Sequence, residues 1–286
     1  MELFVQLLLN GLIAGALYTL IAVGFNLIYG TVKFFDLGYG AMVVVGGYLA
    51  WFFSRQIGLD IITSSVLAVF LTGVLGVLVY YFVYSPLRKK KASNMVLLVA
   101  SLGVITAIQA IIAILFTSQF KSLSVGAQKI YNIGPGVVTQ IQIITLILGF
   151  LVVAGLALLL KKTFLGRAIR AIGDDEEVSK IIGINTAVII ALVFFIGAAI
   201  GGLGGILFGL DTGIEPLVGF KLLLKGVIAS IIGGVGNVWG GIAGAFILGL
   251  VENFGIWKIS AEWKDAIAFG LLIIFLIFRP SGIFRK

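Results

Sequence analysis

The chain has 286 residues, of which 60% are hydrophobic and 11% charged, with a formal net charge of +8. These polar residues are too few to cover the surface of a water-soluble protein of this size. The composition therefore indicates a polytopic membrane protein with a single membrane domain, residues 1–286. The absence of Cys and His excludes disulfides, thiol or imidazole catalysis and Cys/His metal sites. We therefore expect no catalytic residue and no metal site.

The positive charge lies in three clusters at the ends of apolar runs, at 88–91, 161–170 and 279–286. This placement is typical of cytoplasmic loops and argues against nucleic-acid binding. Nine crossings put all three clusters in the cytoplasm, with the N-terminus outside and the C-terminus inside. The first apolar run follows an acid, Glu2, where a signal peptide needs bases, so we expect it to remain as a span.

The apolar segments predict an all-α fold with about nine transmembrane helices, eight or ten being the alternatives. We place these helices at 3–30, 34–54, 61–84, 94–117, 140–160, 187–210, 218–236, 238–256 and 264–279. The loops between them on the outer side are short. Segment 118–139 is the longest, and we expect it to meet any extracytoplasmic partner.

Glycine occurs 39 times, often at four-residue spacing that aligns it on one helix face. The predicted packing glycines are Gly197, Gly201, Gly205, Gly209, Gly236, Gly240 and Gly244. Such faces allow close helix packing in lipid, and the alternative is Gly-rich broken helices that line a solute route. Glycine-rich spans in both halves are also compatible with an inverted repeat. No G-x-x-x-x-G-K-[ST] motif occurs, so we expect this chain to bind no ATP.

Segment 161–186 is an island of mixed charge between two apolar runs. Its bases come first, followed by a predicted turn at Gly173 and then by DDEEVSKIIGI. Asp174 or Asp175 can cap a helix that Gly183 would end, which predicts a helix from 174 to 184. Its apolar face would contain Val178, Ile181 and Ile182. An amphipathic helix outside the membrane is typical of a docking element, and a solvated loop is the alternative.

Several stretches carry a family resemblance. GRAIRAIGDDEEVSKIIGIN, VIIALVFFIGAAIGGLGGILFG and GFKLLLKGVIASIIGGVGNVWGGIAGAFILG resemble the membrane permease of the ATP-driven uptake system for branched-chain amino acids. The likeness extends to NGLIAGALYTLIAVGFNLIYG near the start and EWKDAIAFGLLIIFLIFRPSGIF at the end. The family also includes permeases for urea and short amides. The resemblance implies a multi-pass permease subunit in the cell membrane of a prokaryote.

The resemblance also implies partners. In such permeases the segment at 161–186 is a coupling helix seated in a groove of a separate cytoplasmic ATPase, which holds ATP and Mg. A second homologous permease subunit, two ATPase subunits and an extracytoplasmic solute-binding protein would complete the importer. The implied coupling residues are Arg167, Arg170, Asp174, Asp175, Glu176, Glu177, Val178, Ile181, Ile182 and Gly183.

Polar residues within the apolar runs are candidates for the solute route. After its first span the family usually has Asn-Phe-Ala-His-Gly, where this chain has Asp36-Leu37-Gly38-Tyr39-Gly40. A Lys found in the family fits Lys225, and an ammonium at that depth needs a wet or paired site, with Glu252 and Asp211 as candidate partners. The predicted route residues are Asn26, Asp36, Tyr39, Lys225 and Glu252.

Three alternatives stay open on the sequence. The same machinery could carry urea, short amides or another small polar solute. An ion-coupled secondary transporter would need carboxylates within its spans, of which this chain has few, and would leave the 161–186 segment without a purpose. A membrane enzyme would need a nucleophile, a base or a metal cluster that the sequence does not offer.

Overall fold

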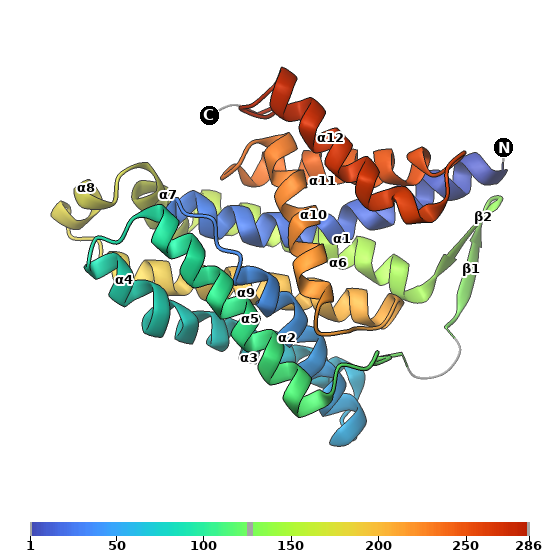
Figure 1. Cartoon of the computed structure of the whole chain (residues 1–286), viewed down its shortest axis with the longest axis horizontal. Coiled ribbons are helices and arrows are strands. Elements are labelled where there is room, and N and C mark those ends of the chain that lie inside the picture. The colour runs from blue at the N-terminus through green and yellow to red at the C-terminus, as the bar shows by residue number, and fades with distance from the viewer. Residues whose placement is uncertain (1, 125–127, 285–286) are drawn as a thin grey trace.

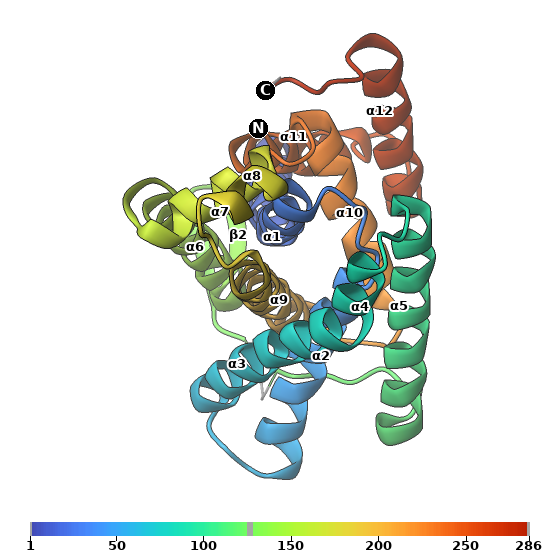
Figure 2. The same cartoon turned by 90° about the vertical axis from the view of Figure 1, so that its left-hand side faces the viewer.

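The computed structural model describes residues 2–124 and 128–284, and most of them form α-helices packed around α1 (Glu2–Val32). Helix α1 runs along the long axis of the molecule and packs against α9 (Thr186–Asp211), α10 (Val218–Gly233) and α11 (Val238–Gly255) (Figure 1). In the end-on view α1 lies inside a ring of helices (Figure 2). In both α1 and α9, 61% of the most apolar stretch is buried, against 17% in α6 (Gln140–Lys162), so α1 and α9 form the centre of the bundle.

The remaining elements flank this centre. They are α2 (Tyr39–Trp51) with a π-helical turn at Phe52–Gln56, α3 (Ile61–Val79) with a π-helical turn at Tyr80–Tyr84, α4 (Ser85–Lys89), α5 (Asn94–Phe116), β1 (Ile130–Ile133), β2 (Gly136–Thr139), α7 (Phe164–Asp174), α8 (Glu176–Ile181), a 3-10 turn at Ala261–Trp263 and α12 (Lys264–Phe278). The β1–β2 hairpin and the start of α1 lie at one end of the molecule, called here the hairpin end. Helices α7 and α8 lie toward the opposite end, called the α8 end (Figure 1).

Each of the nine predicted segments is helical, but the predicted number of crossings is not confirmed. Among the described residues, six helices are long and apolar enough to span a membrane, and together they establish a polytopic helical membrane protein. These six are Glu2–Val32, Ile61–Lys89, Asn94–Phe116, Gln140–Lys162, Thr186–Asp211 and Val238–Gly255. Helices α2, α10 and α12 have 13, 16 and 15 residues. At a rise of about 1.5 Å per residue, each is shorter than the roughly 30 Å hydrocarbon core.

The all-helical membrane fold agrees with the prediction, and part of the 118–139 loop adds a small two-stranded antiparallel hairpin that the sequence did not predict. Gly134, at φ +60°, and Pro135 make its turn, and a positive-φ glycine in a two-residue connection suits the twist of paired strands. Gln6 of α1 ties the hairpin down: its Oε1 accepts from the Val137 N–H at 2.7 Å and its Nε2 donates to the Val137 carbonyl at 3.0 Å. The hairpin is therefore fixed to the start of α1.

The predicted packing glycines lie where helices approach closely. A Cβ placed on Gly205 would lie 1.7 Å from the Val43 carbonyl oxygen of α2, and one on Gly244 would lie 2.0 Å from the Ala229 carbonyl oxygen of α10. A Cβ on Gly240, Gly197, Gly201 or Gly209 would lie 2.3, 2.7, 2.8 or 2.9 Å from its nearest neighbour, which is also too close. Gly236 instead lies in the turn between α10 and α11, at φ +80°. Side chains at these helical positions would force the bundle apart, as expected of small residues at helix contacts in membranes.

Candidate functional site

The charged island at 161–186 folds into two helices, and the first was not predicted. Helix α7 begins after Thr163, whose hydroxyl accepts from the Gly166 N–H at 3.0 Å. It buries Ala168, Ile169 and Ile172 and leaves its arginines exposed. The turn predicted at Gly173 is wrong: this residue is helical and packs so closely on α1 that a Cβ would lie 2.7 Å from the Gly30 carbonyl oxygen.

Helix α8 is the predicted second helix, but it is shorter than the expected 174–184. Asp175, one of the two predicted caps, accepts from the N–H groups of Glu177 and Val178 at 2.8 and 3.0 Å. At the other end the Gly183 N–H donates to the Lys180 carbonyl and the Ile184 N–H donates to the Ser179 carbonyl. This pair of bonds, with Gly183 at φ +87°, is a Schellman ending. Local hydrogen bonds thus fix both ends of α8.

The predicted apolar face of α8 points away from the rest of the chain. The exposed fractions are 52% for Val178, 83% for Ile181 and 66% for Ile182. Exposing three large apolar side chains on so short a helix is unfavourable in water unless another surface covers them. Because α8 lies beyond the long helices at one end of the molecule (Figure 1), this face is available to a partner.

The acidic start of α8 is anchored within the chain. Arg88 lies in α4, and its guanidinium binds one carboxylate oxygen of Glu176. Lys180 Nζ lies 2.8 Å from the other carboxylate oxygen. Partial burial would raise the pKa of Glu176, but the hydrogen bond from Lys180 and the charge of Arg88 outweigh it, so the pKa is lowered. Glu176 therefore stays ionised and connects α8 to α4.

The other implied coupling residues are arranged around this helix. Arg167, Asp174 and Glu177 are exposed. Arg170 is exposed too, and its guanidinium donates to the Leu160 carbonyl at the end of α6. Arg88 was recognised from the sequence only as one of a basic cluster; its link to Glu176 could not be foreseen, because the two residues lie 88 positions apart.

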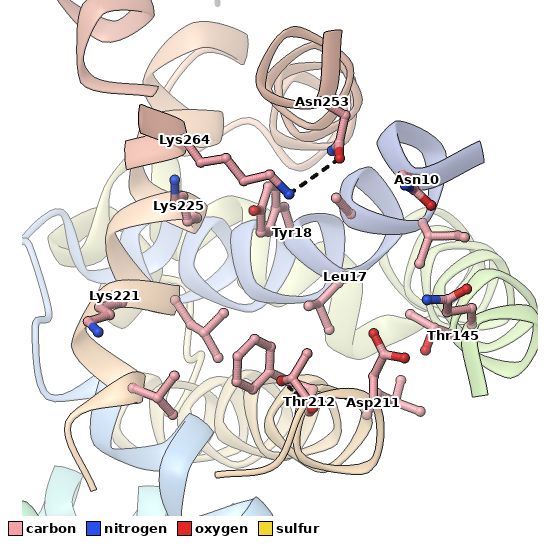
Figure 3. Close-up of a pocket in the computed structure, with 17 residues that line it drawn as sticks. Asn10, Leu17, Tyr18, Thr145, Asp211, Thr212, Lys221, Lys225, Asn253 and Lys264 are labelled. Atoms are coloured by element: carbon pink, nitrogen blue, oxygen red, sulfur yellow. Dashed lines mark hydrogen bonds between the residues drawn. The ribbon is translucent and has the colours of Figure 1, made fainter. Parts of the chain in front are cut away.

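A second feature is a cavity of about 410 Å³ near the hairpin end, lined by both polar and apolar side chains. It lies among α1, α6, α9, α10, α11 and α12, mainly where these helices begin or end (Figure 3). Its polar lining residues are Asn10, Tyr18, Gln142, Thr145, Asp211, Thr212, Lys221, Lys225, Asn253 and Lys264. This volume falls within the range of small-molecule sites in proteins.

Lys225 lies at the edge of this cavity in a network of charges. Its Nζ is 2.6 Å from Glu252 Oε1 and 2.8 Å from Asp265 Oδ1, and the Tyr18 hydroxyl donates to Glu252 Oε2 at 2.8 Å. The predicted partner Glu252 is therefore confirmed. The other, Asp211, is wrong: it lines the cavity but forms no ion pair with Lys225. Asp265 and Tyr18 were not predicted, because only the packing of α12 and α1 brings them here.

The other three predicted route residues do not line this cavity. The Tyr84 hydroxyl donates to Asp36 Oδ1 at 2.5 Å, and Asn26 Oδ1 accepts from the Gly236 N–H at 2.8 Å. Tyr39 is buried, and its hydroxyl lies against Gly24, which has no side chain to block it. Of the five predicted route residues, Lys225 and Glu252 therefore lie together beside the cavity, whereas Asn26, Asp36 and Tyr39 lie elsewhere in the fold.

No group of three or more Asp, Glu, His or Cys side chains gathers among residues 2–124 and 128–284. The charges of the cavity are ammonium and carboxylate groups, which suit the recognition of a charged solute.

Comparison with known proteins shows the family. The profile of a family described as "Branched-chain amino acid transport system / permease component" matches residues 7–276. The chain belongs to this family. The permease is 33% identical to the "High-affinity branched-chain amino acid transport system permease protein BraD" of Pseudomonas aeruginosa, over 99% of this chain and 96% of the relative. It is 29% identical to the protein of the same description named LivH from Escherichia coli K12, with the same coverage.

A solved structure supports the fold. A chain of "PsaBC from Streptococcus pneumoniae in complex with Fab" superposes with a TM-score of 0.54 over 95% of this chain and 91% of that chain, at 14% identity. That identity supports a shared fold alone. As a permease component the chain is a transport subunit and not an enzyme, and the word component marks it as part of a larger system.

Proposed function

We propose that this permease forms part of the membrane route for branched-chain amino acids in an ATP-driven importer. The full-length similarity to relatives named for this transport supports the substrate class. The observation that carries the coupling to a partner is α8, a helix fixed at both ends whose three large apolar side chains are uncovered in this chain.

The proposed topology has nine crossings in the cell membrane of a prokaryote, with the N-terminus outside and the C-terminus in the cytoplasm. It treats residues 1–286 as one permease domain and includes the short helices α2, α10 and α12 among the crossings. The basic clusters support it, since bases collect on the cytoplasmic side. On this topology α8 faces the cytoplasm, and the hairpin and the cavity face outward.

We assign α8 and the neighbouring residues of segment 161–186 to coupling. In this proposal Val178, Ile181 and Ile182 enter an apolar groove on a separate ATPase, which holds ATP and Mg, and this chain binds no cofactor. Burying three such side chains would contribute several kcal/mol to the contact. The rest of the proposed importer is a second homologous permease, a second ATPase and an extracytoplasmic solute-binding protein.

The class of machine can be tested by copurification in mild detergent. We expect the tagged permease to bring down an ATPase subunit in stoichiometric amount, together with ATP hydrolysis. A permease that purifies alone from several mild detergents, with no associated hydrolysis, would contradict the proposal. Urea or a short amide is the alternative solute, and competition between labelled leucine and urea during uptake distinguishes the two.

A further inference from the structure

The cavity at the hairpin end carries both signs of charge on separate walls. Figure 3 shows Lys264 and Tyr18 on one side of Leu17, and Asp211 and Thr212 on the other. Apolar side chains cover much of the surface between these walls; they are Ile13, Leu17, Leu207, Phe208 and Leu222. The cavity therefore combines an apolar lining with one basic and one acidic side chain on different walls.

Most of the charges around the cavity are already neutralised within the chain. Lys225 has two carboxylates within 2.8 Å, and Lys221 lies 3.7 Å from Glu215. Among the described residues, Lys264 has no carboxylate within 4 Å, and its Nζ has only a long bond of 3.4 Å to the Asn253 amide oxygen. Asp211 likewise has no Lys or Arg within 4 Å. Among the described residues, Lys264 and Asp211 thus form no ion pair, although Gln142 hydrogen-bonds to Asp211 and the charge of Lys264 acts on Glu252 at longer range.

Both charges lie at helix ends that disfavour them. Asp211 is the last residue of α9, at the partially negative carbonyl end of that helix, and Lys264 is the first residue of α12 after the 3-10 turn at Ala261–Trp263, near its partially positive N–H end. A carboxylate at a helix C-terminus and an ammonium at an N-terminus are unfavourable for the helices themselves. Each is compensated when a ligand group of opposite charge binds there.

We infer that this cavity is a binding site for a zwitterionic amino acid with an apolar side chain. Asp211 accepts the solute ammonium, Lys264 binds its carboxylate, and the apolar residues around Leu17 contact its side chain. This inference rests on the proposed function and adds a place and an orientation for the solute. A neutral amide or urea would leave both wall charges uncompensated, and a singly charged solute would leave one.

The inference is tested by removing the charges of the solute and of the cavity in turn. The purified permease in lipid nanodiscs is titrated with L-leucine, with 4-methylpentanoate, which lacks the ammonium, and with 3-methylbutylamine, which lacks the carboxylate. We expect either analogue to bind the wild-type chain at least about tenfold more weakly than leucine, since a charged hydrogen bond is lost.

The variants Asp211→Asn and Lys264→Gln should change this preference in opposite ways. Each should weaken leucine binding by at least about tenfold. Asp211→Asn should bind leucine and 4-methylpentanoate equally well and still reject 3-methylbutylamine. Lys264→Gln should bind leucine and 3-methylbutylamine equally well and still reject 4-methylpentanoate. Glu262→Gln and Lys258→Gln, in the exposed connection before α12, are the matched controls and should bind like wild type. Elution as a single folded species by gel filtration is required of every variant.

The result that overturns the inference is distinct from failure of the proposed function. If the wild-type chain binds no leucine up to its solubility limit, or if the two variants lack the crossed preference, the cavity is not this site. Leucine uptake by the complete wild-type importer is measured in parallel. Uptake without the crossed preference removes only the cavity site, whereas absence of leucine uptake removes the proposed substrate.

Discussion

Lys225 and Glu252 are paired where little water reaches them, with exposed side-chain fractions of 11% and 1%. A buried pair adds little net stability compared with apolar residues, but removal of one partner leaves an uncompensated charge. The ion pair explains how the bundle tolerates both groups. Lys225 also lines the cavity, so we predict a second role for it in solute transport.

The variant Lys225→Met separates these roles. Because it leaves Glu252 buried and unpaired, we expect a loss of stability of about 3 kcal/mol, seen as a lower Tm in detergent. The double variant Lys225→Met with Glu252→Gln should recover most of that Tm. We expect uptake to remain low in the double variant, since Lys225 lines the cavity. Wild-type uptake by the double variant would reduce Lys225 to a structural residue.

The Arg88–Glu176 contact makes the attachment of α8 dependent on pH. The lowered pKa of Glu176 means that its stabilising contribution is complete above the ordinary carboxyl value and is lost as the pH falls through the folded-state value. We therefore expect α8 to stay attached at neutral pH and to loosen below about pH 4.

Spin labels can follow this loosening, because the chain has no Cys of its own. Labels at Lys90→Cys and Glu177→Cys should give a narrow distance distribution at neutral pH and a broad one in acid. Glu176→Gln should give the broad distribution at both pH values, and the exchange Arg88→Glu with Glu176→Arg should restore the narrow one at neutral pH. An unchanged distribution in Glu176→Gln would show that other contacts hold α8.

At the scale of the helix, α8 should dock through its apolar face. Ile182→Glu places a charge where we expect an apolar contact, which should cost about 2 kcal/mol or more and weaken the complex more than tenfold. Lys162→Gln is the control, because it changes a charge at the end of α6 without touching α8. ATPase copurification and solute-stimulated hydrolysis are measured for both. If Ile182→Glu keeps both, α8 is not the coupling helix.

The sequence predicted α8 because its signals are local. Asp175 and Gly183 form their hydrogen bonds within a few residues of themselves, so spacing along the chain was enough. Helix α7 was missed although Thr163 could cap it and Ala168, Ile169 and Ile172 have helical spacing, because glycine was read as a turn. In the structure Gly166 and Gly173 are helical and allow close packing.

The cavity could not be predicted from the sequence. Its walls come from six helices, and Tyr18 meets Glu252 across 234 positions of chain. Hydropathy identifies apolar segments but not which side chains of distant helices meet. Of the two candidate partners that the sequence offered for Lys225, only Glu252 pairs with it in the structure, and Asp265 is the second partner. The sequence also places crossings at α2, α10 and α12, whose helices are shorter than a bilayer core, so the count of nine crossings stays a prediction.

For the whole molecule, we expect the two ends of the chain on opposite sides of the membrane, because three basic clusters require an odd number of crossings. Single cysteines at Glu2, Lys129, Lys162 and Ser281 can be labelled in sealed cells with an impermeant reagent. The first two should react from outside and the last two only after permeabilisation. Labelling of Glu2 and Ser281 from the same side would contradict the nine-crossing topology.

The central claim is that this permease moves branched-chain amino acids by ATP-driven coupling, and uptake by the purified importer in proteoliposomes tests it most directly. With the solute-binding protein outside and ATP at the ATPases, we expect labelled leucine to accumulate, with competition from unlabelled isoleucine and valine and none from urea. Leucine uptake that ignores ATP, or that urea suppresses as strongly as valine does, would contradict it.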